Sequence, residues 1–288
     1  MKLSKVDRIF TISVYVILTI FGLTIILPFF NLLAVSLSDQ VAVSNGEVTL
    51  FPVRFTLSAY KFVLDNTQFW NGFKSSVIVT VIGTVLALIV TTLTAYPLSK
   101  KKFKGRKAFL IFFIIVMLFN GGLIPNYILI TGIGLKDTYA ALILPGLLSI
   151  YNMLLIKNYF ETLPESLIES AKIEGAGELT IFTKIVLPLS LPTLATIGLF
   201  YAVGFWNSYF NGMLYISTPS KMPLQTYLQT LLNMSHIPAH ELPPDVADSL
   251  STESIRAASI FTATLPILIL YPYLQKFFVK GLVVGSEK

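Results

Sequence analysis

The sequence contains no cysteine, and only 12% of its residues are charged. The absence of cysteine excludes a disulfide framework and a thiolate metal site. The charged fraction lies far below the roughly 25% that is typical of soluble globular proteins. The chain also has no Gly-Lys dipeptide, so it lacks the GxxxxGK[ST] loop that cradles nucleotide phosphates. These absences exclude an ordinary soluble domain and a P-loop nucleotidase.

The chain is instead rich in apolar residues, which make up 54% of it and give a mean hydropathy of +0.75. A bilayer core requires about 20 consecutive apolar residues. Six segments have about this length or more: 9–37, 75–98, 108–131, 139–156, 187–216 and 255–278. We therefore predict an all-α, polytopic membrane protein with six transmembrane helices, folded as a single domain over residues 1–288.

The 21 lysines and arginines are distributed unevenly among the loops between these segments. With the N-terminus inside, 15 of them lie in inner segments and six in outer ones, and the loop 100–107 (KKKFKGRK) alone holds six. This asymmetry satisfies the positive-inside rule. It predicts cytoplasmic N- and C-termini and outer loops at 38–74, 132–138 and 217–254. The net charge of +6 then reports topology, and nucleic-acid binding is not needed to explain it.

The apolar segments contain no Asp, Glu, Lys or Arg once their ends are excluded. Carriers coupled to ions or protons usually keep such groups at mid-membrane, where they form the coupling site. Their absence favours a conduit for a neutral solute. Backbone carbonyls can also bind sodium, so an ion-coupled secondary transporter stays open as an alternative.

The predicted inner loop at residues 157–187 is more polar than the segments on either side of it. Pro164 and Glu165 predict the start of a helix there, and Gly175 and Gly177 predict its end. The predicted apolar face of this helix consists of Leu167, Ile168 and Ala171. A second helix is expected from Glu178 onward, with Ile181, Phe182, Ile185 and Val186 on its apolar side. An amphipathic connector lying on the membrane surface is the alternative interpretation.

The spacing within this loop resembles the EAA loop of binding-protein-dependent ABC importer permeases. That pattern is Glu-Ala-Ala, three residues, Gly, nine residues and Ile-x-Leu-Pro. This chain supplies it with Glu169, Ser170, Ala171, Gly175, Ile185, Val186, Leu187 and Pro188. Ser170 in place of alanine is the single departure, and it is a small residue for another. The six segments are similar to the maltose-type (MalG-like) sugar permeases, and stretches such as FWNSYFNGMLYI resemble most the LplC-type branch of Gram-positive bacteria.

The resemblance implies a multi-pass permease subunit of an ATP-driven importer in the bacterial plasma (inner) membrane. Such a subunit moves a sugar, here an oligosaccharide or polysaccharide fragment, into the cytoplasm by alternating access. The expected partners are a second homologous permease subunit, a cytoplasmic ABC ATPase dimer, an extracellular solute-binding (lipo)protein and the lipid bilayer. The core helices would span about 75–283. A permease for a non-sugar solute is the alternative within the same class.

The resemblance also implies that this chain is not an enzyme and binds no cofactor, since ATP and Mg belong to the partner ATPase. The inner loop would be the coupling element, in which small residues permit close approach and glutamates pair with basic groups on the partner. The expected coupling residues are Glu169, Ser170, Ala171, Glu174, Gly175, Ala176, Ile185, Leu187 and Pro188.

Aromatic and amide side chains within the apolar segments are the candidates for contact with the solute, because sugars present both apolar ring faces and hydroxyls. These candidates are Asn120, Tyr151, Asn152, Trp206, Asn207, Tyr209, Phe210 and Asn211. On one continuous helix, Asn207 and Asn211 would share a face. An interfacial aromatic belt with interhelical amide hydrogen bonds is the alternative interpretation. No metal site is predicted, since Pro238 separates His236 from His240 and no third ligand is evident.

Overall fold

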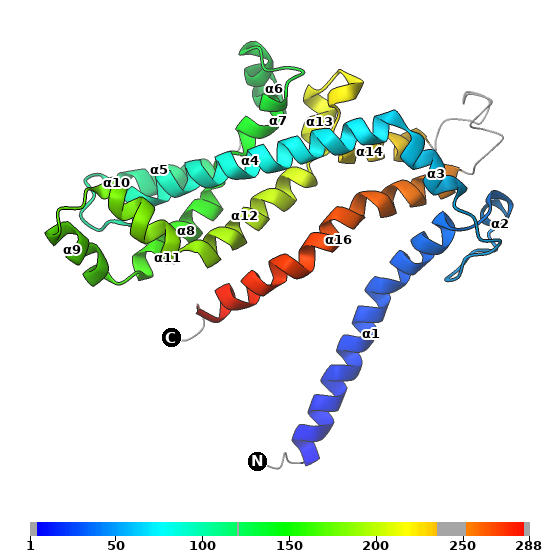
Figure 1. Ribbon diagram of the computed structural model, residues 1–288, viewed down its shortest axis with the longest axis horizontal. Helices are drawn as coiled ribbons and strands as arrows, with labels where there is room; N and C mark the ends of the chain where they lie inside the picture. Colours follow the sequence, from blue (N-terminus) through cyan, green and yellow to red (C-terminus); the bar gives the residue numbers. More distant parts are fainter. Residues whose placement is uncertain (1–4, 120, 235–251, 285–288) are drawn as a thin grey trace. The chain divides into compact units, whose positions relative to one another are not determined.

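The computed structural model describes residues 5–119, 121–234 and 252–284 of the chain. Within these ranges the regular structure is helical, apart from an isolated bridge between Ser38 and Phe55 (Figure 1). Helices satisfy their backbone hydrogen bonds within the segment, as a chain in lipid requires. The prediction of an all-α, membrane-type fold is confirmed.

The described chain forms two compact units. The first is built from Met1–Phe69 and Leu228–Leu265, and the second from Trp70–Tyr227 and Pro266–Lys288. The longer helices are α1 (Lys5–Ser36), α4 (Thr67–Ser99), α5 (Arg106–Leu118), α6 (Leu123–Gly132), α8 (Ile150–Thr162), α9 (Glu165–Ile173), α12 (Leu191–Trp206), α14 (Leu224–Met234) and α16 (Thr252–Val284). The shorter ones are α2 (Gln40–Ser44), α3 (Ser58–Asp65), α7 (Tyr139–Ile143), η1 (Leu144–Gly146), α10 (Glu178–Ile181), η2 (Phe182–Val186), α11 (Leu187–Leu189), α13 (Phe210–Tyr215) and η3 (Pro219–Lys221).

In the first unit, α1 is mostly apolar from Ile9 onward, and most of its side chains are exposed as far as Phe30. A helix with this composition and no covering protein surface is what a lipid-facing span requires. Its C-terminal end is held by a small core that includes Ala34, Ala42 and Val43. The Ser36 hydroxyl also lies 2.8 Å from the Tyr60 hydroxyl of α3, so α3 is tied to the end of α1.

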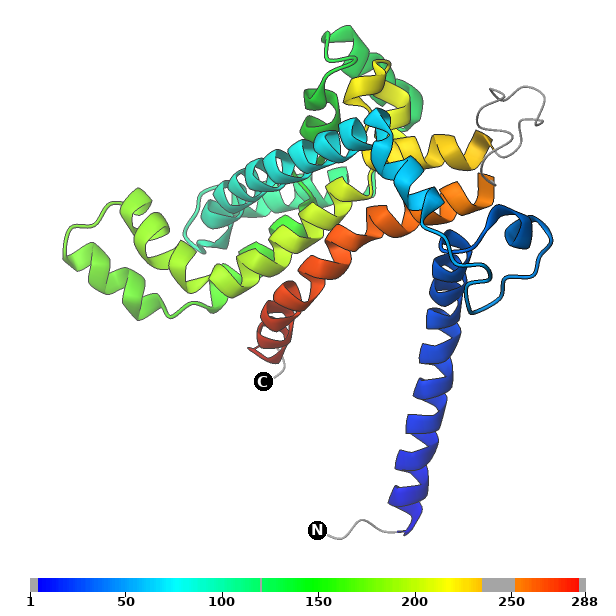
Figure 2. The ribbon, with the colours of Figure 1, turned by 45° about the vertical axis from the view of Figure 1, so that its right-hand side comes forward.

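In the second unit, α4 and α12 lie side by side in both views (Figures 1 and 2). The 33 residues of α4 span about 50 Å at 1.5 Å per residue, which exceeds the hydrocarbon core of a bilayer. Fully buried apolar side chains from α8 and α12, such as Met153, Ile156 and Ile197, form the centre of this core.

Three of the predicted spans are not continuous helices. Segment 108–131 is divided between α5 and α6, and Gly122 at this break adopts a φ of +89°. Segment 139–156 is bent by 49° between Tyr139–Gly146 and Ile150–Thr162, and segment 187–216 by 80° between Glu178–Leu189 and Leu191–Trp206. Prolines lie beside both bends, where they cannot complete the helical hydrogen bonds. These three apolar segments are therefore each built from two helical pieces.

Two described helices, Asp7–Ser36 and Thr67–Ser99, are long and apolar enough to cross a membrane alone. The number rises to five if each of the three bent pairs of described helices counts as one span. Broken helices are tolerated at membrane depth where the protein itself covers the freed backbone. The count of six spans and the orientation of the termini stay predictions.

Candidate functional site

The inner loop at 157–187 folds into the two helices that the sequence predicts, joined by a tight turn. α9 begins after Pro164 and is capped at Glu174, and Gly175 follows with a φ of +82°. The Ala176 amide donates to the Ala171 carbonyl at 2.9 Å, and the Gly175 amide donates to the Lys172 carbonyl at 3.0 Å. This is a Schellman cap, in which a left-handed residue lets the last carbonyls of a helix find donors. Glycine takes that conformation at no steric cost.

The two faces of this turn differ in character. Ala171 is buried, and it packs with Ala176 and Ile168 against the core of the second unit. The other face exposes large apolar side chains: Ile173 is 88% exposed, Leu179 72% and Leu167 45%. Exposed apolar side chains grouped at one turn are typical of a protein contact site. Leu167 therefore does not share the inward face that its spacing predicts.

The remaining expected coupling residues divide between the two faces. Glu169, Ser170, Glu174 and Gly175 are exposed at the turn. Ile185 and Leu187 are partly buried, and Pro188 is exposed beside the bend. The predicted apolar side of the second helix is confirmed, since Ile181, Phe182 and Val186 are buried.

Glu178, for which the sequence predicts only the start of a helix, connects the turn to the end of α4. The Tyr96 hydroxyl donates to its carboxylate at 2.8 Å, and Lys172 of α9 forms an ion pair with it at 2.6 Å. The Tyr96 ring packs against Phe182 at 4.8 Å between centroids. Because the two charged side chains are about half exposed, the ion pair alone contributes little stability. The contact instead defines where the turn sits against α4.

A further ionic cluster lies where α4, α5 and α8 meet. Arg106 pairs with Glu161, and its Nε donates to the Leu98 carbonyl of α4 at 2.8 Å. Lys157 lies 2.8 Å from the same carboxylate, and its side chain is only 10% exposed. One glutamate thus neutralises two cations, one of which is almost buried.

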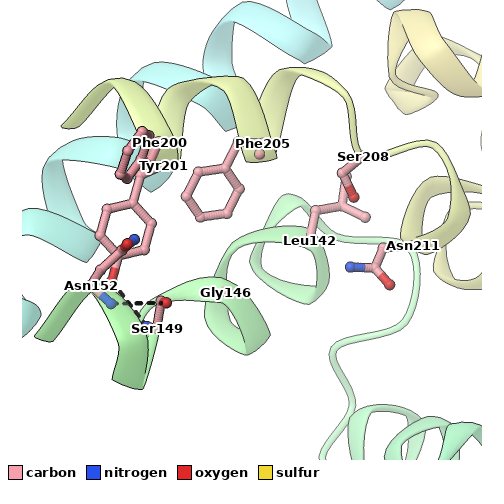
Figure 3. Close-up of a pocket in the computed structure, with 10 residues that line it drawn as sticks. Leu142, Gly146, Ser149, Asn152, Phe200, Tyr201, Phe205, Ser208 and Asn211 are labelled. Carbon is pink, nitrogen blue, oxygen red and sulfur yellow. Dashed lines mark hydrogen bonds between the residues drawn. The ribbon is translucent and has the colours of Figure 1, made fainter. Parts of the chain in front are cut away.

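A cavity of about 300 Å³ opens in the second unit, between α12 and the helices α7 and α8 (Figure 3). Three aromatic rings, two side-chain amides and three hydroxyls, one of them on a tyrosine ring, line it, and none of its lining residues carries a charge. The lining residues are Leu142, Gly146, Ser149, Asn152, Phe200, Tyr201, Gly204, Phe205, Ser208 and Asn211. Ligand pockets of this size commonly combine an apolar wall with a few polar groups that orient the ligand.

Asn152 is the most informative residue of the cavity. It is 6% exposed, and its side-chain amide has no hydrogen-bond partner among the described residues. The contact between Asn152 and Ser149 uses the backbone amide of Asn152, which donates to the serine hydroxyl at 3.4 Å. A buried amide normally finds partners within the protein. An amide that instead faces a cavity is available to a ligand.

Tyr201 joins three helical segments at the wall of the cavity. Its hydroxyl lies 2.7 Å from the Thr91 hydroxyl of α4 and accepts from the Ser149 amide, at the start of α8, at 2.9 Å. Its ring stacks on Phe205, one turn further along α12. The Tyr201 hydroxyl therefore positions both α4 and α8 against α12.

Phe205 occupies a slot between two glycines. A Cβ atom built on Gly83 of α4 would lie 2.9 Å from the Phe205 ring, and one built on Gly146 of η1 would lie 3.0 Å from it. Both distances are at or below the limit for real Cβ contacts. The ring can therefore reach the cavity wall only because two separate backbones lack side chains there.

The structure brings together two of the eight candidate solute contacts, Asn152 and Asn211. Helix α12 ends at Trp206, so Asn207 caps it and does not share a helical face with Asn211; that expectation is wrong. Trp206 is buried and packs edge-on against Phe73, whereas Tyr151, Tyr209 and Phe210 are exposed and line no part of the cavity. Asn120, His236 and His240 lie outside the described residues.

The sequence predicts no role for Ser149, Tyr201 or Ser208, although all three line the cavity. Each lies in or next to an apolar segment, where a single hydroxyl resembles an ordinary packing residue. A sequence signal for this part of the cavity is the spacing of Ser149 and Asn152. A serine three residues before Asn152 is typical of a helix N-cap, and it places both residues in the first turn of α8.

Comparison with known proteins places these features in a family context. Residues 108–284 match the family model described as "Binding-protein-dependent transport system inner membrane component". Protein LplC of Bacillus subtilis (strain 168) is 41% identical over 99% of this chain and 97% of its own length. The polygalacturonan/rhamnogalacturonan transport system permease protein YtcP of the same organism is 39% identical over 98% of this chain and 99% of its length. A crystal structure of a bacterial ABC transporter involved in the import of the acidic polysaccharide alginate superposes with a TM-score of 0.89 at 35% identity, covering 96% of this chain and 99% of that one.

Proposed function

The chain belongs to the family of inner-membrane components of binding-protein-dependent transport systems, and from this membership we propose that it is the permease subunit of an ATP-driven importer for an oligosaccharide or polysaccharide fragment. The carbohydrate assignment is supported by a relative whose name refers to polygalacturonan and rhamnogalacturonan, and by the alginate importer whose fold this chain shares. It works with a second homologous permease subunit, an ABC ATPase dimer and an extracellular solute-binding protein.

The observation that carries this proposal is the exposed turn after α9. An ATPase that moves a membrane subunit needs a rigid element to bind. The capped helix α9, with Ile173 exposed at its end and Leu179 exposed on α10 just after the turn, provides such an element. Glu169, Ser170, Glu174 and Gly175 form the exposed part of this coupling surface, while Ala171 and Ala176 anchor it to the core. Ile185, Leu187 and Pro188 carry the movement toward the bend before α12.

The energy for transport comes from the partner, because ATP and Mg are bound by the ATPase subunits. The sequence of this chain has no phosphate-cradling loop. The permease therefore supplies the solute pathway and the surface on which the ATPase acts, but it performs no hydrolysis itself.

The cavity beside Asn152 and Asn211 is the proposed contact point for one glycosyl unit. Aromatic rings such as Tyr201 and Phe205 offer apolar faces for a sugar ring, and the two amides can bind its hydroxyls. Five other candidate residues do not line this cavity and have no proposed role in contact with the solute: Tyr151, Trp206, Asn207, Tyr209 and Phe210. Alternating access then exposes the cavity to one side of the membrane at a time.

The test is reconstitution of the full complex in liposomes, with a screen of neutral and acidic glycans delivered by the binding protein. ATP-dependent glycan uptake and solute-stimulated ATP hydrolysis are the expected results. Uptake by this chain alone, driven by an ion gradient and indifferent to ATP, would instead identify a secondary transporter. The absence of flux from any assembly, with every glycan, would contradict a transport function.

Replacing Asn152 with leucine is expected to raise the KM for solute about tenfold. The change removes an amide that faces the cavity and has no described protein partner, so little folding stability is lost. About 1.4 kcal/mol, the value of one good hydrogen bond, corresponds to a factor of ten. The measurement is solute-stimulated ATP hydrolysis by the reconstituted complex. Asn207→Leu is the matched control, because that amide is exposed and lies outside the cavity lining; equal effects from both variants would remove the cavity from the proposed pathway.

A further inference from the structure

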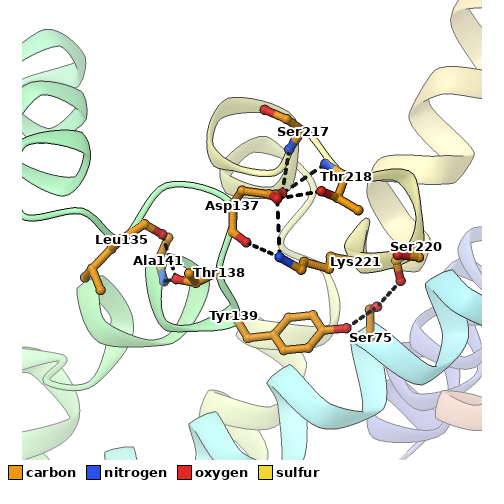
Figure 4. Close-up of polar contacts among 10 residues, drawn as sticks. All are labelled: Ser75, Leu135, Asp137, Thr138, Tyr139, Ala141, Ser217, Thr218, Ser220 and Lys221. Atoms are coloured by element: carbon orange, nitrogen blue, oxygen red, sulfur yellow. Dashed lines mark hydrogen bonds and ion pairs between the residues drawn. The ribbon is translucent and has the colours of Figure 1, made fainter.

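Asp137, in the short turn between α6 and α7, forms a cluster of polar contacts with the segment that follows α13 (Figure 4). Its carboxylate accepts from the backbone amides of Ser217 at 3.0 Å and Thr218 at 2.9 Å, and from the Thr218 hydroxyl at 2.5 Å. Lys221 donates to the Asp137 carbonyl at 2.7 Å and pairs with its carboxylate at 3.3 Å. We call these four residues the clasp.

The backbone of Asp137 takes part in the same connection. Its amide donates to the Tyr215 carbonyl, at the end of α13, at 2.9 Å. The residue has a φ of +61°, a left-handed conformation that aspartate tolerates better than most side chains. Asp137 therefore holds α13 through both its main chain and its side chain, whereas an ordinary surface ion pair involves the side chain alone.

The clasp closes over a small apolar core shared by the same helices. Ile130 of α6, Ala141 of α7 and Tyr215 of α13 are buried together, and the Tyr127 and Tyr215 rings stack with centroids 6.1 Å apart. Beside it, the Tyr139 hydroxyl lies 2.9 Å from the Ser75 hydroxyl of α4. The polar contacts of the clasp and the packing of this apolar core thus join α6, α7 and α13.

The helices held by the clasp carry two walls of the cavity. Leu142 lies on α7 and Asn211 on α13, and they are 69 residues apart in the sequence. The non-helical segment 207–209 links α12 to α13. Because the two helices are not continuous, contacts other than this link must fix the position of α13 against the cavity.

We propose that Asp137 is a positioning residue for transport: by clasping α7 to α13 it holds Asn211 against the cavity and makes these two walls move as one body when the cavity opens and closes. This inference rests on the proposed function, because it assigns a role to the same cavity. In the predicted topology the clasp lies at the outer side of the membrane, where the solute is received.

The clasp persists through mild acid. Hydrogen bonds from the Thr218 hydroxyl and backbone hold the pKa of the Asp137 carboxyl well below its ordinary value of 3.8. A carboxyl whose pKa is lowered on folding contributes stability that is present above the unfolded pKa and is lost only as the pH falls through the lower, folded value. Assays between about pH 5 and pH 8 therefore examine the clasp in its closed, ionised form.

The first test is a double-mutant cycle with Asp137→Asn and Lys221→Met in the reconstituted complex. Asparagine also tolerates a left-handed backbone, so this change removes the charge with little strain. We expect each single variant to raise the KM for solute about fivefold while kcat changes less than twofold. The double variant is expected to be no worse than Asp137→Asn, because contacting residues are not additive. Lys136→Met, at an exposed neighbouring lysine, is the control and should leave KM unchanged.

An unchanged KM, or additive effects in the double variant, would overturn the positioning role. A merely structural defect would instead lower kcat and the amount of folded complex, and leave KM as it is. Failure of the proposed function is distinguishable from both, because then the wild-type complex itself would show no ATP-dependent flux.

The second test replaces the clasp with a covalent one. The chain has no cysteine, so Asp137→Cys with Thr218→Cys provides the only thiol pair in this subunit. If α7 and α13 move together, the oxidised variant transports at least as well as the reduced one. Transport that stops on oxidation and returns on reduction would show that the two helices must separate. Failure of the pair to cross-link would contradict the contact itself.

Discussion

Replacing Gly175 with valine is expected to lower solute transport and solute-stimulated ATP hydrolysis by more than about tenfold. Gly175 has a φ of +82°, where a left-handed backbone costs an ordinary residue about 1–2 kcal/mol and a β-branched one more. The helix would lose its Schellman cap, so the carbonyls of Ala171 and Lys172 would need other donors. The coupling surface would then lose the fixed geometry with which the ATPase engages it.

Two matched variants separate the backbone effect from the effect of bulk. Apart from each glycine and its two chain neighbours, no atom of the described residues lies within 4 Å of a Cβ placed on Gly175 or on Gly177. Gly177 has an ordinary φ of −71°, so Gly177→Val adds the same side chain without backbone strain. Gly175→Asn adds bulk but tolerates the left-handed conformation. Co-purification of the ATPase and its stimulation by solute are the measurements. If Gly175→Val keeps both at the wild-type level, the coupling assignment is wrong.

Replacing Glu161 with alanine is expected to destabilise the subunit by about 3 kcal/mol, because it leaves two cations without their shared partner. Lys157 is the costly one, since its side chain is 10% exposed and its remaining hydrogen bond among the described residues is to the side-chain oxygen Oδ1 of Asn158 at 3.2 Å. Arg106 would lose its contact with α8, although it keeps the Leu98 carbonyl. The measurement is the thermal unfolding of the purified complex in detergent.

A compensating variant distinguishes unpaired charge from lost packing. Glu161→Leu combined with Lys157→Met removes both the anion and the more buried cation, and it should recover most of the stability that Glu161→Ala loses. Glu174→Ala serves as the control for loss of a glutamate, because Glu174 is exposed and forms no ion pair among the described residues. A loss from Glu161→Ala no larger than that from Glu174→Ala would show that the cluster does not contribute to stability.

The fold of the inner loop at residues 157–187 was largely predictable from sequence because its signals are local. Pro164 and Glu165 mark the start of α9 and Gly175 marks its end, and all three act within one helical turn of the feature they specify. The exposure of Ile173 was not predictable in the same way. Apolar spacing shows which residues could share a face, but not that this face lacks a partner within the chain.

The bends and the cavity were less predictable because they depend on contacts between distant segments. The hydrophobic runs correctly indicated membrane helices, but hydropathy does not register a change of direction at Ser190 or between Gly146 and Ile150. The cavity joins Leu142 to Asn211, and its wall depends on a hydrogen bond between Tyr201 and Thr91, 110 residues apart. A serine or tyrosine in an apolar run has the same local pattern whether it faces a cavity, a neighbouring helix or lipid.

The slot that holds Phe205 constrains three positions jointly. One aromatic ring fills the space that side chains at Gly83 and Gly146 would otherwise occupy, so the three residues share a single volume. A larger residue at either glycine becomes acceptable when position 205 is reduced by a matching amount. A larger side chain at one of these three positions therefore requires a smaller one at another. The size of the Phe205 ring sets how closely the backbones of α4, η1 and α12 approach one another here.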